Sequence, residues 1–271
     1  MPDYIDYCGA RIPVHTGKSA RGLYNLPDDE IDHFRNGTNF TEDGSLFVEG
    51  EGFGTPFEER MPTIPLAEAK ERAEFLEANG ATLFDVARRL NIPCKNQNGL
   101  PFCWGYGALT AYELNYAGRY NRYTELSADL TCAEATGGRS RGGWANEFLK
   151  VAEKRGIAPQ SMVKHHDRNF RKYDTPEVNA ERAKYIPTEW LDFKRGDMDA
   201  LRSCLVSNIA AGMGLMWWGH LVAFAGWTWR PKYGELWLYR NSHSKRFGND
   251  GWAFCTTGPA THGGGSAVLV A

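Results

Sequence analysis

The sequence predicts an α+β fold, because patterns typical of helices and patterns typical of strands occupy different parts of the chain. Apolar residues recur at helical spacing over residues 66–79, 83–90, 105–114, 145–155 and 197–207. Short apolar runs typical of buried strands follow at residues 208–218, 220–226 and 235–240. Residues 1–65 are rich in Gly, Pro, Asp and Asn, so we expect an irregular extension there with a few short strands, one of them at 45–48.

Two helices are predicted in the first third of the chain. In the first, over residues 66–79, Pro65 suits the first turn and Gly80 suits the C-terminal cap. In the second, over residues 83–90, Thr82 and Asp85 have the spacing of a capping box. In that motif each of the two side chains accepts a hydrogen bond from the backbone N–H of the other residue. We expect the first helix to pack on the surface of the main domain.

Length and composition predict one large domain, or one domain with an extension, because 271 residues with 42% hydrophobic residues can bury a full core. The net charge of -2 offers no electrostatic footprint for nucleic acid or for an anionic membrane surface. No stretch approaches the roughly 20 apolar residues of a membrane span. The first residues lack the charged start and apolar block of a secretory signal. We therefore expect a cytoplasmic or other reducing compartment, with attachment to a larger particle left open.

The cysteines are widely scattered, at Cys8, Cys94, Cys103, Cys132, Cys204 and Cys255. Without a C-x-x-C or comparable spacing, they argue against a zinc site and against a dense disulfide framework. The run His165-His166-Asp167 could suggest a metal site, but adjacent histidines on a loop usually point apart, and we interpret the run as a solvated loop. We expect no metal and no cofactor.

Residues 92–114 carry the strongest chemical signal in the chain. A turn at Asn98-Gly99 leads to Cys103, and small residues then open a helical pattern. A thiol at the start of a helix lies in the field of unpaired backbone N–H groups, which favours the thiolate, the form that acts as a nucleophile. Gln97 lies six residues earlier, where its side-chain NH2 and the backbone N–H of Cys103 can form an oxyanion hole.

This segment resembles the start of the mature papain-like cysteine peptidases, in which the run Lys95-Asn96-Gln97 precedes the pair Cys103-Trp104 by this spacing. A cysteine beside an aromatic residue is by itself typical of an inert core. The identification therefore depends on agreement further along the chain.

The second landmark of the family appears in the expected order, as Leu126-Ser127, Cys132, Gly142-Gly143 and a helix that closes in Gly156-Ile157. Without a side chain, the backbone at Gly143 can come close enough to bond an extended peptide as an added strand. The resemblance implies substrate-binding roles for Gly142, Gly143, Trp144 and Trp104, with the two tryptophans as walls of the cleft.

The third and fourth landmarks are His220, which leads an apolar strand ending in Gly226-Trp227, and Asn241, which follows the next strand. The resemblance implies that Gly219 and Leu221, on either side of the histidine, line the substrate site. It also implies a catalytic set with Cys103 as nucleophile, His220 as general base and acid, Asn241 as the group that orients the imidazole, and Gln97 as oxyanion donor.

The fold implied by the resemblance has two lobes, a helical lobe that carries the nucleophile and a curled antiparallel sheet, or half-barrel, that carries the histidine. We expect the peptidase domain at residues 81–271. Residues 1–80 are then an N-terminal extension that is a permanent accessory and offers a surface for a protein partner. The substrate is expected to be a peptide or protein.

The sequence departs from the family in two ways. Leu100 and Ser140 stand where secreted members have paired cysteines, so we expect no disulfide. His243 stands where the family has a tryptophan that covers the hydrogen bond between His220 and Asn241. We expect that bond to be wetter than in typical members and the activity to be modest.

Two functions from different classes remain open. The first is a cysteine endopeptidase. The second is a papain-fold structural or binding component of a larger assembly, for example a viral particle, with weak or no peptidase activity. The presence of all four catalytic residue types favours the first, because a protein without enzymatic function is free to lose them.

Overall fold

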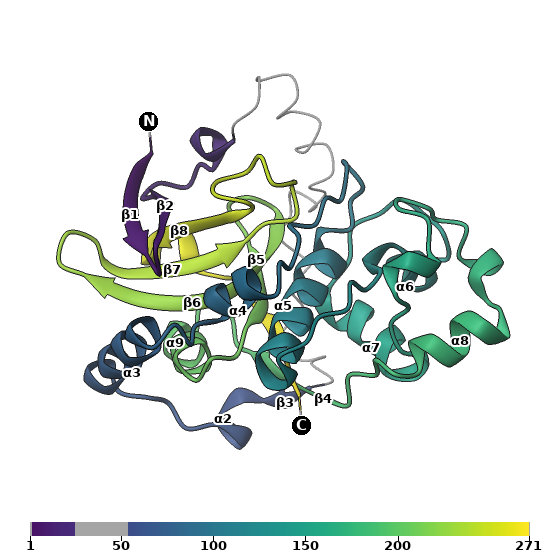
Figure 1. Cartoon of the computed structure of the whole chain (residues 1–271), viewed down its shortest axis with the longest axis horizontal. Coiled ribbons are helices and arrows are strands. Elements are labelled where there is room, and N and C mark those ends of the chain that lie inside the picture. The colour runs from purple at the N-terminus through teal and green to yellow at the C-terminus, as the bar shows by residue number, and fades with distance from the viewer. Residues whose placement is uncertain (1, 25–53, 271) are drawn as a thin grey trace.

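The computed structural model describes residues 2–24 and 54–270, in which one half of the molecule contains one large sheet with helices packed on it and the other half is helical (Figure 1). The predicted strand at 45–48 lies outside the described residues. The helices are α2 (Phe57–Arg60), α3 (Leu66–Ala78), α4 (Leu83–Arg89), α5 (Cys103–Tyr120), α6 (Ala128–Thr136), α7 (Ala145–Arg155), α8 (Pro176–Arg182), α9 (Met198–Val206) and α10 (Thr257–Ala260). The strands are β1 (Asp3–Tyr7), β2 (Ala10–His15), β3 (Thr55–Pro56), β4 (Glu189–Phe193), β5 (Ala211–Leu215), β6 (His220–Arg230), β7 (Gly234–Arg240), β8 (Trp252–Thr256) and β9 (Gly265–Leu269).

The sheet has the strand order β1-β2-β8-β7-β6-β5-β9-β4-β3. Its neighbours run antiparallel except for the parallel pairs β2 with β8 and β3 with β4. At its centre, the first nine residues of β6 are all buried, because α5, α3 and α9 pack against this strand. This explains why the strand reads as a continuous apolar run and not as an alternating one.

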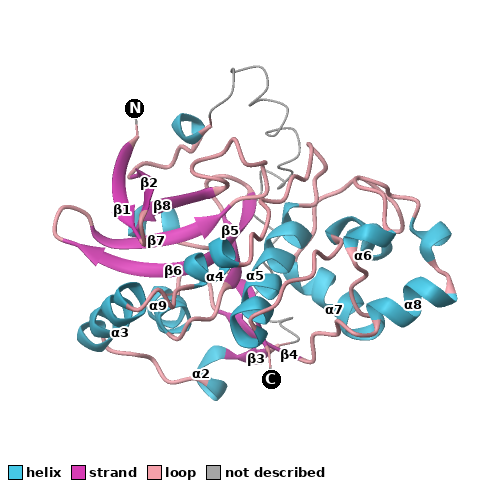
Figure 2. Ribbon diagram, in the orientation of Figure 1, coloured by secondary structure: helices cyan, strands magenta, loops and turns pink. Residues whose placement is uncertain are grey.

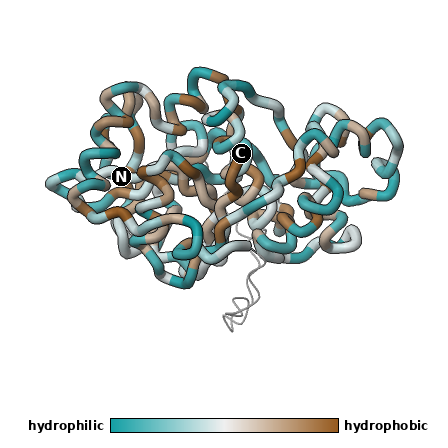
Figure 3. The backbone as a smooth tube through the Cα atoms, turned by 90° about the horizontal axis from the view of Figure 1, so that it is seen from below, coloured by the Kyte–Doolittle hydropathy of each residue, from teal (hydrophilic) through white to brown (hydrophobic). Residues whose placement is uncertain are grey.

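The helical half consists of α6, α7 and α8, and the long helix α5 runs between it and the sheet (Figure 2). α5 contacts both α6 and α7 on one side and β5, β6 and β9 on the other. Its buried side chains join a core with those of the neighbouring helices, including Trp104, Leu109, Phe148 and Leu149. Hydrophobic segments run mainly through the middle of the molecule (Figure 3). α5 is therefore the element that connects the two halves and fixes where Cys103 lies.

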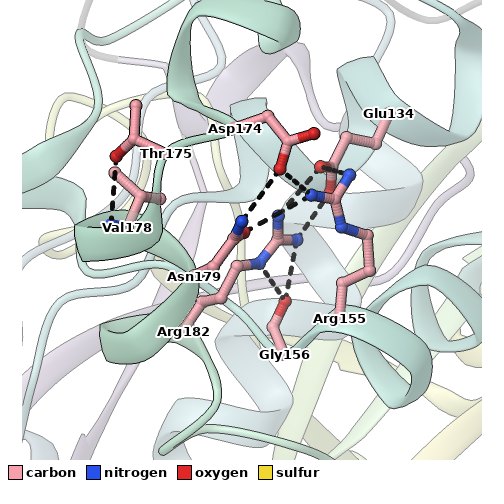
Figure 4. Close-up of polar contacts among 8 residues, drawn as sticks. All are labelled: Glu134, Arg155, Gly156, Asp174, Thr175, Val178, Asn179 and Arg182. Atoms are coloured by element: carbon pink, nitrogen blue, oxygen red, sulfur yellow. Dashed lines mark hydrogen bonds and ion pairs between the residues drawn. The ribbon is translucent and has the colours of Figure 1, made fainter.

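A buried ion-pair network ties α6, α7 and α8 together (Figure 4). The guanidinium of Arg182 donates to both carboxylate oxygens of Glu134, at 2.8 and 2.6 Å, and to the carbonyl oxygen of Gly156. Arg155 also pairs with Glu134, at 2.8 Å. Gly156 ends α7 with a positive φ of 74°, and a Cβ there would lie 1.9 Å from the carbonyl oxygen of Arg182, so only glycine fits.

The N-terminal residues belong to the same sheet as the rest of the chain. β1 pairs with β2, and β2 pairs with β8, where Val14 lies opposite Phe254. α3 (Leu66–Ala78) occupies the range predicted for the first helix, and the capping box of Thr82 and Asp85 is present. The predicted domain boundary near residue 80 stays a prediction. Strands β1, β2 and β3 precede that residue, and they belong to the same sheet as strands β4 to β9.

None of the helices in residues 2–24 and 54–270 has the length and apolar character of a membrane span.

Candidate active site

Cys103 is the first residue of α5, and its side chain is buried. Burial raises the pKa of its thiol to about 11, although the backbone N–H groups of Leu221, Trp104 and Cys103 itself act in the opposite direction. The helix start therefore favours the thiolate as predicted, but the loss of solvent outweighs it.

His220 opens β6, and Asn241 directly follows the last residue of β7. Because these strands are antiparallel neighbours, with Ala223 opposite Arg240, the two side chains meet at one end of the sheet. Nε2 of His220 lies 2.7 Å from Oδ1 of Asn241, and both residues are buried. Burial lowers the pKa of His220 to about 4, and the hydrogen bond with Asn241 opposes this shift. The other ring nitrogen, Nδ1, has no hydrogen-bond partner within residues 2–24 and 54–270.

The first turns of α5 pack directly on the start of β6. A Cβ on Gly107, one turn after Cys103, would lie 2.3 Å from Cδ2 of Leu221 and 3.0 Å from its carbonyl oxygen. The N–H of Leu221, the neighbour of His220, also acts on the Cys103 thiol. The structure thus brings the start of the Cys103 helix, α5, to the start of the His220 strand, β6. The prediction that the thiol and the imidazole come within hydrogen-bond reach stays a prediction.

Gln97 is fully buried and held at three points. Its backbone N–H donates to the carbonyl oxygen of Ser242 at 2.9 Å, and its Oε1 accepts from the Ser242 hydroxyl at 2.6 Å. Its Nε2 donates one N–H to the carbonyl oxygen of Leu100 at 2.8 Å. The same Nε2 carries a second N–H, which this bond does not use. Ser242, which fixes this amide, was not among the predicted residues, and its only sequence signal is its place next to Asn241.

No family model and no curated protein matches this sequence. Solved structures do match it. Digestive procathepsin L 3 of Tenebrio molitor larval midgut is 15% identical, with a TM-score of 0.62, covering 90% of this chain and 80% of that one. The ragweed pollen allergen Amb a 11, a cysteine protease in its proform, is 17% identical, with a TM-score of 0.61, covering 89% and 77% of the two chains. The bromelain protease from Ananas comosus in complex with the E64 inhibitor is 17% identical, with a TM-score of 0.57, covering 70% and 98%.

The chain has the papain-like fold. This confirms the predicted α+β architecture, in which α5, the helix that begins at Cys103, lies between a helical half and the sheet that contains His220. At identities of 14 to 20%, the similarity is one of fold. The arrangement of the residues themselves must therefore carry any argument about chemistry.

The aromatic cover of His220 includes Trp218, a residue that the sequence analysis did not predict for the site. The His220 ring lies 4.7 Å from that of Trp218 and 4.2 Å from that of His243, between ring centroids, and His243 is fully buried. Trp218 also stacks on Phe247, at 5.9 Å. Trp218 thus supplies an indole beside the buried hydrogen bond between His220 and Asn241. Its position two residues before His220 was the available signal. The expectation that this bond is wetter than in typical members of the family stays a prediction.

The predicted substrate-binding residues fall into two groups. Gly143 lies against the indole of Trp104, and a Cβ there would come within 2.7 Å of the ring. Trp104 is fully buried and donates its indole N–H to the carbonyl oxygen of Pro101. It therefore packs behind Gly143, and the prediction that its side chain lines the cleft is wrong. Leu221 is also buried. The partly exposed members of the predicted set are Gly142, Trp144 and Gly219.

One cluster of metal-type ligands lies among the described residues, formed by Asp129, His165 and His166, whose ligand atoms are within 4.8 Å of one another. The two imidazoles face the same region because His166 has a positive φ of 61°, which sequence reasoning could not foresee. Both oxygens of Asp129 already accept hydrogen bonds, from the Tyr106 hydroxyl and from the N–H of His166. Nε2 of His166 lies 2.8 Å from the carbonyl oxygen of Asn96. These bonds engage both oxygens of Asp129 and Nε2 of His166 within the protein, and we propose no metal.

A cavity of about 450 Å³ lies at the far end of α5 from Cys103. Gly118 and Arg119, near the C-terminus of that helix, line it together with Glu189 and Leu269 at the ends of β4 and β9. The Cys103 thiol lies at the opposite end of an 18-residue helix, about 27 Å long. This cavity is therefore separate from the candidate active site.

Proposed function

We propose that this protein is a cysteine peptidase that hydrolyses peptide bonds through Cys103 and His220, with Asn241 and Gln97 as supporting groups. The observation that carries the proposal is the buried hydrogen bond between His220 and Asn241, at the end of the strand that meets the start of the Cys103 helix. A bond to Nε2 leaves Nδ1 as the ring atom that can exchange a proton with the thiol.

In the proposed reaction, Nδ1 of His220 takes the proton of the Cys103 thiol as the sulfur attacks the substrate carbonyl carbon. The backbone N–H of Cys103 and the second N–H of Gln97 Nε2 stabilise the negative charge that develops on the carbonyl oxygen. The imidazolium then gives its proton to the leaving amine, and a thioester remains. Water, activated by the same imidazole, hydrolyses the thioester and restores the thiol.

The burial of both groups affects the resting state of the proposed pair. Burial raises the pKa of Cys103 to about 11 and lowers that of His220 to about 4, so both effects favour the uncharged thiol and imidazole. The charged thiolate–imidazolium pair is populated only if the attraction between the two charges offsets the solvation that both groups lose on burial. Proton transfer coupled to the attack on the substrate fits this setting.

The same burial is the specific observation that favours the second candidate, a papain-fold structural or binding component of a larger assembly. Cys103 is only 3% exposed, and His220 is fully buried. In this alternative, residues 1–80 bind a protein partner.

All six cysteines are free thiols, which suits the proposed cytoplasmic or other reducing compartment.

Hydrolysis of casein and of a mixture of internally quenched peptides separates the two candidates. We expect cleavage by the native protein and its loss in Cys103→Ala. Cys8→Ala is the matched control, because Cys8 is a free thiol on the turn after β1 and should leave cleavage unchanged. A folded native protein that cleaves none of these substrates would support the binding component.

A further inference from the structure

Tyr24, near the N-terminus, reaches the histidine that packs on His220. Its hydroxyl oxygen lies 2.6 Å from Nδ1 of His243, and the two rings stack with centroids 5.9 Å apart. Backbone contacts hold this segment in place, since the N–H of Gly248 donates to the carbonyl oxygen of Leu23 at 2.7 Å, and Tyr24 forms a β-bridge with Phe247. The contact is therefore built into the fold.

His243 in turn forms one wall of the His220 imidazole, with ring centroids 4.2 Å apart and planes tilted by 42°. Two imidazoles at this separation cannot both carry a proton without strong repulsion. The lowered pKa of His243, which burial causes and the neighbouring His220 reinforces, agrees with a neutral ring.

Among the described residues, several elements near this pair of rings carry polar or titratable groups. The helix α5 begins at Cys103, next to the start of the His220 strand, and the N-terminal segment contributes Tyr24. The loop before α5 contributes Lys95, whose charge is paired with Glu113 at 2.9 Å. On the sheet side, His15 bonds Tyr239 at 3.0 Å and contacts the ring of Trp217. Of these groups, the Tyr24 hydroxyl is the one that contacts Nδ1 of His243, at 2.6 Å.

We propose that Tyr24 is a positioning residue for His220, acting through His243. Its hydroxyl donates to Nδ1 of His243, which places the proton of that ring on Nε2 and keeps the ring neutral and fixed against His220. This inference rests on the proposed peptidase function. It makes the N-terminal segment a part of the active site and not only an accessory to the fold.

The physical consequence concerns the acid side of the pH profile. Removing the hydroxyl removes a hydrogen bond to neutral His243, so that ring binds a proton at higher pH than before. A cation there disfavours a proton on His220, so His220 becomes a weaker base toward the Cys103 thiol as soon as His243 is protonated. Reactivity should therefore be lost at a higher pH when the hydroxyl is absent.

The test is the pH dependence of Cys103 alkylation by iodoacetamide, followed by mass spectrometry in the full chain. We expect Tyr24→Phe to move the acid limb to higher pH, and to lower kcat about three- to tenfold with KM nearly unchanged. Tyr233→Phe is the matched control, because that hydroxyl also ties the N-terminal segment to the sheet, through Asp3 at 3.0 Å, but at the far end of β6. It should leave the acid limb in place.

A second pair of variants separates positioning from general stabilisation. In His243→Phe the imidazole acceptor is gone, so adding Tyr24→Phe should move the acid limb no further. An additive shift in the double variant, or an unshifted limb in Tyr24→Phe, would overturn the inference. If the alkylation rate of Cys103 in the native protein only rises with pH toward the pKa of an unpaired thiol, with no plateau in the neutral range, the proposed function itself fails and the inference fails with it.

Discussion

Nε2 of His220 and Oδ1 of Asn241 lie 2.7 Å apart in a buried setting, where an amide oxygen can only accept a hydrogen bond. The relationship therefore assigns the proton of the neutral imidazole to Nε2 and leaves Nδ1 as the basic atom. The same amide oxygen also accepts from the N–H of Ser242, at 2.7 Å, which fixes the direction of the carboxamide.

Asn241→Ala should lower kcat by about 10- to 100-fold, because the imidazole then loses the partner that sets its tautomer and direction. KM should change little, since Asn241 is buried and does not face substrate. Steady-state kinetics on a quenched peptide measures both constants. Asn249→Ala is the control, because that side chain bonds the carbonyl oxygen of Arg11. Equal losses in the two variants would show that Asn241 acts only on stability.

Gln97→Ala should lower kcat by about 100-fold, because one donor to the developing oxyanion disappears. Ser242→Ala should have a smaller effect, since it removes only the hydroxyl that holds Oε1 of Gln97 and keeps the amide itself. The comparison requires kcat and KM for each variant. A greater loss in Ser242→Ala than in Gln97→Ala would contradict an oxyanion role for Gln97.

The pH profile of kcat/KM should show a broad plateau across the neutral range. The reactive pair holds one proton. As pH falls through the pKa of His220, which burial lowers to about 4, the pair gains a second proton and His220 can no longer act as a base. As pH rises through the pKa of Cys103, which burial raises to about 11, the last proton is lost and none remains for the leaving amine. A narrow bell centred near pH 6 would show that burial does not set these limits.

Arg182→Leu should reduce the free energy of unfolding by about 3 kcal/mol, because it leaves the Glu134 carboxylate without a buried partner. The Arg182 side chain is only 1% exposed, whereas that of Arg155 is 31% exposed. Arg155→Leu is therefore the matched comparison and should cost about 1 kcal/mol or less. Urea unfolding followed by circular dichroism gives both values, and equal losses would mean that burial does not distinguish the two arginines.

Features that depend on nearby residues were predictable from the sequence. The bounds of α3 and α9, the capping box at Thr82 and the buried strand from His220 all follow from local periodicity and capping. The resemblance to papain-like peptidases then predicted the fold, because its landmarks fall in the family's order.

Features that depend on distant pairings were not predictable. Strands β2 and β8 are separated by more than 230 residues, and neither has a strong pattern of its own. The contacts of Ser242 with Gln97 and of Tyr24 with His243 exist only because the sheet and loops bring these segments together. The depth of burial of Cys103 likewise follows from packing across α5 and β6, and it reverses the pKa shift that the helix start alone would give.

The central claim, that Cys103 is a nucleophile paired with His220, is tested most directly by treating the native protein with an epoxysuccinyl inhibitor and locating the adduct by peptide mapping. We predict a single adduct on Cys103 that is lost in His220→Ala, with the other five thiols unmodified. No adduct on Cys103, or an adduct that forms equally fast in His220→Ala, would contradict the claim.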